Sequence, residues 1–163
     1  MVNNVAVTPL TERLIAFLRQ NGADFSVVTH EPVRTSEEAA RVRGTPLEQG
    51  AKALVYRADR QPVLLVLPAS RRVDTRAFKQ MFGIKDLRMV SADDLRELTG
   101  MEVGAVPPFG LLMDIPTYVD ERLLLLPRIS FNAGSRTTSV IMSARDYARL
   151  AEATPARFAA DET

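Results

Sequence analysis

The chain has no cysteine and only one histidine, His30, among its 163 residues. Without cysteine there are no disulfides, no thiolate zinc sites and no cysteine nucleophiles. A single histidine also excludes a zinc site built from two histidines and a carboxylate. The composition is compatible with a reducing compartment, and we expect neither a metal nor a cofactor.

Long apolar runs and phosphate-binding loops are absent too. No apolar run approaches the ~20 residues of a membrane-spanning helix, and the first residues lack the basic-then-apolar layout of a secretion signal. Neither Gly-x-x-x-x-Gly-Lys-Ser/Thr nor Gly-x-Gly-x-x-Gly occurs, so nucleoside triphosphate and dinucleotide sites lack their phosphate loop. We expect a cytoplasmic protein with no membrane partner.

His30 is the one residue that could complete a Ser-His-Asp triad, but it lies in a turn before Pro32. The Gly-x-Ser-x-Gly motif that presents a nucleophilic serine is also missing. We therefore expect His30 to be a turn residue or a hydrogen-bonding residue in a pocket wall rather than a general base.

Charge is nearly balanced, with a net charge of +1, 46% hydrophobic residues and 25% charged residues. Such a composition is typical of one globular domain, and it creates no uniform field for nucleic-acid binding. We predict a single domain over residues 1–163 with its core at about residues 10–150, and ends (1–8 and after Ala153) that fray. Arginine clusters, which more often form solvated faces than binding sites, occur at Arg41/Arg43 and Arg71/Arg72/Arg76.

Periodicity and end signals predict an α+β fold. Helices are expected over residues 9–20, 35–44, 74–83, 91–98 and 143–150. Strands are expected over residues 25–29, 51–56, 63–67, 87–90, 111–113, 117–119, 123–126, 129–131 and 138–142. The strands outnumber regular βαβ units, and several need only short turns between them. A mixed, strongly curved sheet or barrel-like core with helices packed outside therefore fits better than a doubly wound fold.

Lys52 is the most unusual residue, because it lies within Gly50–Tyr56, a segment that otherwise resembles a buried strand. Alternation places it on one strand face with Leu54 and Tyr56. An ammonium there must reach solvent, pair with a carboxylate, or face a cavity in which it acts chemically. Taken alone, an edge-strand lysine that discourages aggregation is an equally good explanation.

Two loops of small residues complete the inventory. Gly104–Gly110 holds Pro107 and Pro108 between two glycines, and Phe131–Ser135 leaves a strand in a way that would expose backbone N–H groups, as in an anion nest. Each loop alone is better explained as an ordinary turn. Together with Lys52, they suit a site that grips a carbonyl, carboxylate or phosphate and lets water attack.

These segments resemble the YbaK/ProX family in sequence and in order. The resemblance rests on Gly50-Ala51-Lys52-Ala53-Leu54-Val55, Gly104–Gly110, Asp120 and Phe131–Gly134. The helix at residues 35–44 and the closing helix with Ser143 and Asp146 fit as well, so the likeness spans about residues 10–150. It implies an aminoacyl-tRNA deacylase fold that is also inserted in bacterial prolyl-tRNA synthetases as an editing domain.

The resemblance implies a trans-editing hydrolase that cleaves the ester between a wrong, small amino acid and the 3′ end of a tRNA. Lys52 is then the residue tied to activity, holding the phosphate of the terminal adenosine or polarising the ester while it stays protonated. Amides of the Gly104–Gly110 loop would stabilise the oxyanion while water attacks with help from a ribose hydroxyl. Substrate contacts are expected from His30, Thr35, Gly104, Pro108, Phe109, Gly110, Asn132, Ala133 and Gly134.

Two positions depart from the branches of the family. Position 132 carries serine in the branch that edits Cys-tRNA and histidine in the alanine-editing branch, whereas this chain has Asn132. Ala53 follows the lysine where the alanine-editing branch has asparagine. The resemblance names aminoacyl-tRNA as a partner and admits a synthetase as a second, but specifies neither the amino acid, the tRNA nor the oligomeric state.

Two other functions stay open. The chain would also suit a non-catalytic module that binds tRNA or a synthetase, with the arginine clusters supplying a salt-dependent affinity. A third possibility is a small-molecule binder or a hydrolase of free acyl esters or amides.

Overall fold

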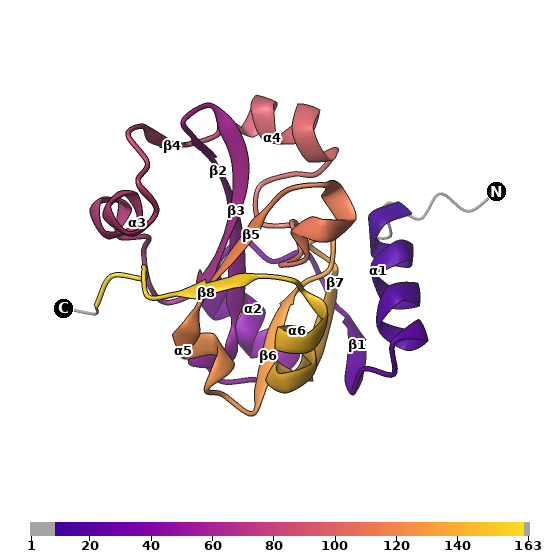
Figure 1. The fold of residues 1–163 in the computed structure, drawn as a ribbon. Helices are drawn as coiled ribbons and strands as arrows, with labels where there is room; N and C mark the ends of the chain where they lie inside the picture. Colours follow the sequence, from indigo (N-terminus) through magenta and orange to yellow (C-terminus); the bar gives the residue numbers. More distant parts are fainter. Residues whose placement is uncertain (1–8, 162–163) are drawn as a thin grey trace.

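Two β-sheets form the centre of the computed structural model, which describes residues 9–161 (Figure 1). The smaller sheet is antiparallel, with the strand order β1 (Phe25–Thr29), β7 (Thr138–Ser143), β6 (Arg128–Asn132). The larger sheet has the order β4 (Leu87–Met89), β2 (Ala51–Ala58), β3 (Gln61–Pro68), β5 (Thr117–Asp120), β8 (Thr154–Ala156). It is antiparallel from β4 to β3 and parallel from β3 to β8.

A single parallel bridge between Gly50 and Ser130 connects the two sheets. Within residues 9–161 the strands do not close into a barrel. The predicted mixed α+β fold with a curved sheet is therefore confirmed, and the two sheets replace the barrel-like alternative.

The helices pack around these sheets, with α1 beside β1 and β7 on one side and α3 at the opposite side (Figure 1). The α-helices are α1 (Pro9–Gln20), α2 (Ser36–Arg43), α3 (Thr75–Phe82), α4 (Ala92–Thr99), α5 (Glu121–Leu124) and α6 (Ala144–Leu150). Two 3₁₀ turns are η1 (Leu47–Gln49) and η2 (Gly110–Met113). Across residues 9–161 no helix has the length and apolar character that crossing a membrane requires.

Side-chain caps explain why most of the predicted helices form where the sequence places them. The hydroxyls of Thr35, Ser91 and Ser143 accept hydrogen bonds from backbone N–H groups three residues later, at 3.1, 3.1 and 3.2 Å. The Asp74 carboxylate does the same for Ala77 at 3.0 Å. Each bond satisfies one of the N–H groups that a helix start leaves unpaired.

The β2–β3 hairpin is tighter than expected. Asp59 and Arg60 alone form the turn, with φ of 47° and 77°. Positive φ at both positions is the two-residue type I′ turn, whose twist matches that of the strands. Each strand therefore runs two residues or so beyond its predicted end, to Ala58 and from Gln61.

Two predicted strands are wrong. Leu123 and Leu124 belong to α5 and residues 125–126 to the turn after it, because the Asp120 carboxylate accepts a hydrogen bond from Arg122 N–H at 3.0 Å and caps a helical turn. Residues 111–113 form η2, which is closed by a 3.0 Å bond from Ile115 N–H to Gly110 O. In both places local polar bonds override an apolar run that resembles a strand.

The predicted fraying after Ala153 is also wrong. Strand β8 pairs in parallel with β5, and the Phe158 ring is fully buried against Phe78, with ring centroids 5.5 Å apart. The N–H groups of Phe158 and Ala159 donate to the buried Asp120 carboxylate at 3.0 and 2.7 Å. The fraying predicted for residues 1–8 lies outside the described residues.

Two hydrophobic clusters lie on opposite faces of β2 and β3. One contains Ala53 and Phe131, and the other contains Tyr56 and Phe78 with Leu54 packed against it. Alternation places Lys52 on the face of Leu54 and Tyr56, as the sequence predicts. Lys52 therefore extends from a strand that is packed on both sides.

The buried C-terminal segment can be tested with Phe158→Ala. Removing a fully buried ring should lower the free energy of unfolding by about 3–5 kcal/mol, measured by urea denaturation. Arg157→Ala is the matched control, because the exposed Arg157 makes only a surface ion pair with Glu121, worth roughly 0–1 kcal/mol. Equal small effects for the two variants would show that the segment is not part of the core.

Candidate functional site

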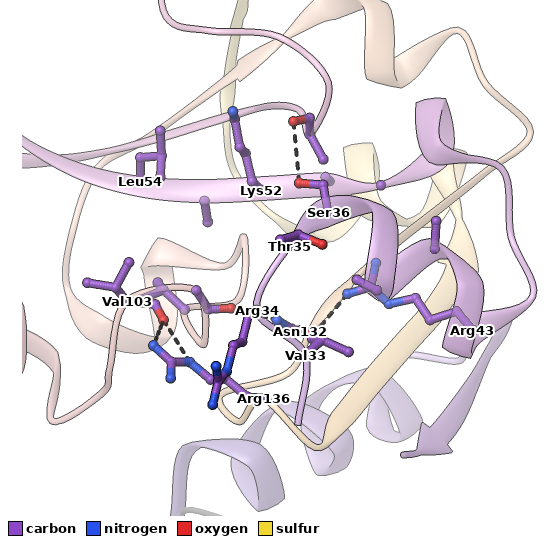
Figure 2. A pocket seen from close by; sticks show the side chains of 18 residues that line it. Val33, Arg34, Thr35, Ser36, Arg43, Lys52, Leu54, Val103, Asn132 and Arg136 are labelled. Carbon is purple, nitrogen blue, oxygen red and sulfur yellow. Dashed lines mark hydrogen bonds between the residues drawn. The ribbon is translucent and has the colours of Figure 1, made fainter. Parts of the chain in front are cut away.

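A cavity of about 420 Å³ lies where α2, the first half of β2 and the loop before η2 meet (Figure 2). Its wall comes from residues 33–36, 39–40 and 43, 50–54, 69, 103–104 and 106, 132 and 136. Four of these residues carry a positive charge, namely Arg34, Arg43, Lys52 and Arg136, and none is Asp or Glu. The cavity is therefore suited to an electron-rich or anionic ligand.

Lys52 faces this cavity and has no carboxylate partner within residues 9–161. Burial, with a contribution from the nearby charge of Arg72, holds the pKa of Lys52 below its ordinary value of 10.5. Of the three environments that the sequence allows for this ammonium, pairing with a carboxylate is not found within residues 9–161, and Lys52 lies half-buried in the cavity wall. In Figure 2 the side chain of Lys52 points away from Asn132.

Arg43, the last residue of α2, forms the second polar centre of the cavity. Its Nε donates to Ser139 Oγ at 2.9 Å and its Nη2 donates to Asn132 Oδ1 at 2.9 Å. Burial lowers the pKa of Arg43 to about 10, which leaves the guanidinium charged at neutral pH. Like Lys52, Arg43 forms no ion pair within the described part of the chain.

These bonds fix the Asn132 amide in one orientation. Its Oδ1 accepts from Arg43 and, at 3.2 Å, from the Ser139 hydroxyl, while its Nδ2 donates to Gly104 O at 2.6 Å. The end of β6 is thereby tied to the loop that carries Gly104. One hydrogen of Nδ2 is left to serve as a donor toward a ligand.

His30 lies one hydrogen bond behind this cluster and does not line the cavity. Its Nδ1 contacts the Glu31 carbonyl at 2.8 Å, and its Nε2 contacts Ser139 Oγ at 2.7 Å. The position agrees with a residue that supports the pocket wall through hydrogen bonds.

Three residues of the Gly104–Gly110 loop lie in the core instead of along the cavity. Phe109 is fully buried, with its ring 5.9 Å from that of Phe131, and the Pro108 carbonyl accepts a 2.8 Å bond from Tyr147 Oη. Gly110 N–H donates to Thr117 Oγ1 at 3.0 Å, and a Cβ there would collide with Thr117 and Ile115. Of the residues in this loop, Gly104 and Val106 line the cavity, together with Val103, which precedes the loop.

The loop at Phe131–Ser135 does not leave the amides of Ala133 and Gly134 free for an anion. Ala133 N–H donates to Thr138 O at 2.9 Å, and Gly134 N–H donates to Ala105 O at 2.8 Å. Among the predicted substrate contacts, the structure thus places Thr35, Gly104 and Asn132 at the cavity with Lys52, while Ala133 is buried in the core.

Sequence reasoning did not assign Arg43 and Arg136 to the site. A signal for Arg43 exists, because it follows the buried Ala39 and Ala40 by four and three residues and therefore shares their helix face. Arg136 binds the segment just before Gly104, since its Nε and Nη2 donate to Val103 O at 3.0 and 2.6 Å. Nothing in its sequence context indicates that contact.

The predicted arginine clusters separate in the structure. Arg41 is exposed, whereas its neighbour Arg43 enters the cavity. Arg71 donates to Ala160 O at 3.1 Å, and Arg72 is exposed beside Lys52.

Residues 30–150 match the aminoacyl-tRNA editing domain family. The multifunctional Ser/Thr-tRNA deacylase ProXp-y of Escherichia coli (strain K12) is 40% identical over 146 residues, which cover 86% of this chain and 87% of that protein. A proline–tRNA ligase of Caldicellulosiruptor bescii is 31% identical over 106 residues, which cover 65% of this chain and 18% of the ligase.

The fold is similar to that of solved structures as well. A crystal structure described as a candidate trans-editing enzyme for prolyl-tRNA synthetase superimposes with a TM-score of 0.83 and 27% identity, over 95% of this chain and 99% of that one. The similarity in fold therefore extends over nearly all of both chains.

Arg43→Lys tests the cluster around Asn132. The planar guanidinium of Arg43 donates to Ser139 Oγ and Asn132 Oδ1 at the same time. A lysine ammonium cannot reproduce both bonds, so at least one of these acceptors loses its donor. We expect the free energy of unfolding in urea to fall by about 1–3 kcal/mol. Arg41→Lys, a change at an exposed position on the same helix, should leave the free energy of unfolding unchanged. Equal stabilities of the two variants would show that the Arg43 guanidinium does not stabilise this cluster.

Proposed function

Because this chain belongs to the aminoacyl-tRNA editing domain family, we propose that it is a trans-acting deacylase that hydrolyses the ester between a wrongly attached amino acid and the 3′ end of a tRNA. The family and the hydrolase class predicted from the sequence are confirmed by the match over residues 30–150 and by the related deacylase. Aminoacyl-tRNA is accordingly the substrate.

The observation that carries the proposal is the cationic cavity around Lys52. The 3′ end of an aminoacyl-tRNA brings phosphates and an ester carbonyl, all electron-rich, to a wall with four cationic side chains, of which Arg136 is paired with Glu102 at 3.4 Å. Charges held out of water act more strongly on such groups than exposed charges do. Among the described residues, this wall offers no carboxylate as a general base, so a hydroxyl of the terminal ribose is left to assist the attacking water.

We assign Lys52 an electrostatic role. As a protonated ammonium it holds the phosphate of the terminal adenosine or polarises the ester, and it does not attack the carbonyl itself. Its lowered pKa follows from burial and from Arg72 rather than from a neighbouring base. Thr35 and Gly104 form the adjacent walls.

For the amino acid we propose serine or threonine. The support comes from the related Escherichia coli protein, named as a Ser/Thr-tRNA deacylase, and from polar groups in the cavity wall. The remaining Nδ2 hydrogen of Asn132 is a donor for the side-chain hydroxyl of such a substrate. Val33, Val103 and Val106 limit the size of the side chain that fits.

For the second partner we propose a prolyl-tRNA synthetase, because a segment of a proline–tRNA ligase resembles this chain. An editing domain that acts in trans on the products of that enzyme would work where translation takes place, in the cytoplasm.

A second candidate function is binding of tRNA without hydrolysis. The exposed Arg72, close to Lys52, and Arg34 at the cavity favour it, because unpaired arginines there would hold phosphates whether or not an ester is cleaved. Affinity for tRNA that falls with salt, together with no release of amino acid, would identify this function.

A panel of tRNAs charged with serine, threonine, alanine, cysteine and proline tests the proposal. We expect release of serine or threonine at a rate well above spontaneous hydrolysis. Lys52→Ala should lower that rate by about 10²–10³-fold, the usual effect of removing one preorganised electrostatic contact. Lys85→Ala is the matched control, because Lys85 is exposed and is not among the residues that line the cavity.

Two results would count against the deacylase. No release from any member of the panel would leave tRNA binding as the function, and full activity of Lys52→Ala would remove Lys52 from the mechanism.

Lys52→Met tests the electrostatic environment of the lysine independently of activity. Because burial lowers the pKa of Lys52, the unfolded chain binds the proton more tightly, so Lys52 destabilises the fold below that lowered pKa. This penalty shrinks as pH rises toward 10.5, the ordinary value. We expect Lys52→Met to raise the thermal unfolding midpoint by a few degrees at pH 7 and by less near pH 10.

Lys85→Met should show no such pH-dependent gain. A lower unfolding midpoint for Lys52→Met at pH 7 would mean that an unrecognised partner stabilises the ammonium in the folded protein.

A further inference from the structure

One edge of β2 is open where it passes the cavity. Between residues 51 and 55 the strand pairs only with β3, because β4 pairs with it from Tyr56 onward. On the same side, β6 reaches β2 only through the bridge from Ser130 to Gly50. Residues 51–54 of this open edge line the cavity.

The register of the hairpin shows which backbone groups face that edge. Ala69 N–H donates to Gly50 O at 2.8 Å, and the pairing with β3 continues unbroken to the turn. In an antiparallel pair, hydrogen-bonded residues alternate, so Lys52 and Leu54 direct their N–H and C=O groups to β3. Ala53, between them, directs both of its groups to the open edge.

Bonds on the β4 side fix the same alternation independently. Val90 N–H donates to Val55 O at 3.2 Å, and Asp59 N–H donates to Asp86 O at 2.8 Å. The residues that face this side of β2 are therefore odd-numbered, and Ala53 is the next one along the open edge.

Ala53 N–H and C=O have no partner within residues 9–161. Such buried backbone groups are nearly always paired in proteins, so an unpaired set beside a cavity indicates a place for a ligand or water. The backbone donors expected from sequence at Gly110, Ala133 and Gly134 are engaged by protein acceptors. Ala53 N–H is thus a backbone donor without a partner in the described chain, and it lies directly beside Lys52 in sequence.

We propose that the aminoacyl group of the substrate docks on this edge as one added strand residue. The ester carbonyl oxygen accepts a hydrogen bond from Ala53 N–H, and the α-amino group donates to Ala53 C=O. An extended amino acid presents its nitrogen and its carbonyl on the same side, as a strand residue does, so both bonds form at once. This inference rests on the proposed deacylase function.

The arrangement places a fixed donor at the atom that becomes charged during hydrolysis. Water adds to the ester carbon, the carbonyl electron pair moves onto the oxygen bound to Ala53 N–H, and the tetrahedral intermediate then expels the 3′ oxygen of the tRNA, which takes up the proton. The donor strengthens its bond as negative charge develops, which is the property of an oxyanion hole. The next residue back, Lys52, adds positive charge.

In this arrangement, different residues bind the backbone and the side chain of the amino acid. Ala53 binds the amino and carbonyl groups that all amino acids share, while Asn132 and the valines of the wall contact the side chain. The described residues of the wall include no carboxylate, and Ala53 C=O is an acceptor that faces this edge for the amino group.

Ala53→Pro removes the N–H and leaves the carbonyl, and a proline N–H facing an open edge is the position at which a strand tolerates proline. We expect deacylation to fall by about 10²–10³-fold, with affinity for uncharged tRNA unchanged. Ala53→Gly, which keeps the N–H, should retain most of the activity. Wild-type activity in Ala53→Pro, with a wild-type circular dichroism spectrum, would overturn the proposal.

The second arm changes the substrate, so it remains informative if the proline variant does not fold. A tRNA charged with 3-hydroxypropanoate differs from seryl-tRNA only in lacking the α-amino group. We expect it to be hydrolysed at least about tenfold more slowly relative to its spontaneous rate, because Ala53 C=O loses its donor. Equal hydrolysis of the two esters would refute the amino-group contact.

A binding measurement separates failure of this inference from failure of the proposed function. The probe is adenosine with L-serine joined to its 3′ position through an amide, followed by ¹⁵N–¹H NMR. A downfield shift of the Ala53 amide proton supports docking on the edge even if no mischarged tRNA is hydrolysed. Saturation by the probe without a change at Ala53 overturns the docking even if the protein is an active deacylase.

Discussion

The one-sided pairing of β2 is the constraint on which the site depends. Beyond the bridge from Gly50 to Ser130, β2 stays with β3 while β6 continues beside β7, so the two sheets separate and leave a cavity between them. Helix α2 covers this gap and brings Arg43 into it. Strand β2 is packed against a hydrophobic cluster on each face, which holds it in the centre of the fold beside this opening.

Positive charge without counter-charge is the electrostatic consequence of that geometry. Lys52 and Arg43 each have a lowered pKa with burial as the main cause, and neither meets a carboxylate in the described chain. A protein selected for stability alone would pair these groups or replace them with apolar residues, since a half-buried unpaired charge is unfavourable. Retaining both makes sense if the substrate supplies the missing electron density. Burial of these two unpaired charges then both destabilises the fold and strengthens the binding of an electron-rich substrate.

The sequence predicts the elements that local chemistry determines. Helix ends follow from caps such as Thr35 and Ser143, and the inward face of Lys52 follows from strand alternation. The failures lie where distant residues decide. Asp120 caps a helical turn and accepts bonds from Phe158 and Ala159, so one buried carboxylate both converts a predicted strand into α5 and anchors a segment expected to fray.

The candidate site could be predicted from the sequence only in part, because some of its contacts join residues that are far apart in the sequence. Lys52, Gly104 and Asn132 were identified by pattern, whereas Phe109 resembles a loop residue until its packing against Phe17 and Tyr147 is known. Arg43 shows the limit most clearly, because it fixes Asn132 across 89 residues of sequence. The hydrogen bonds that residue 132 of β6 can offer to a ligand thus depend on Arg43 of α2 as well. A histidine there would direct a ring nitrogen at a buried guanidinium, so exchanging residue 132 alone should not transfer specificity between branches of the family unless residue 43 changes with it.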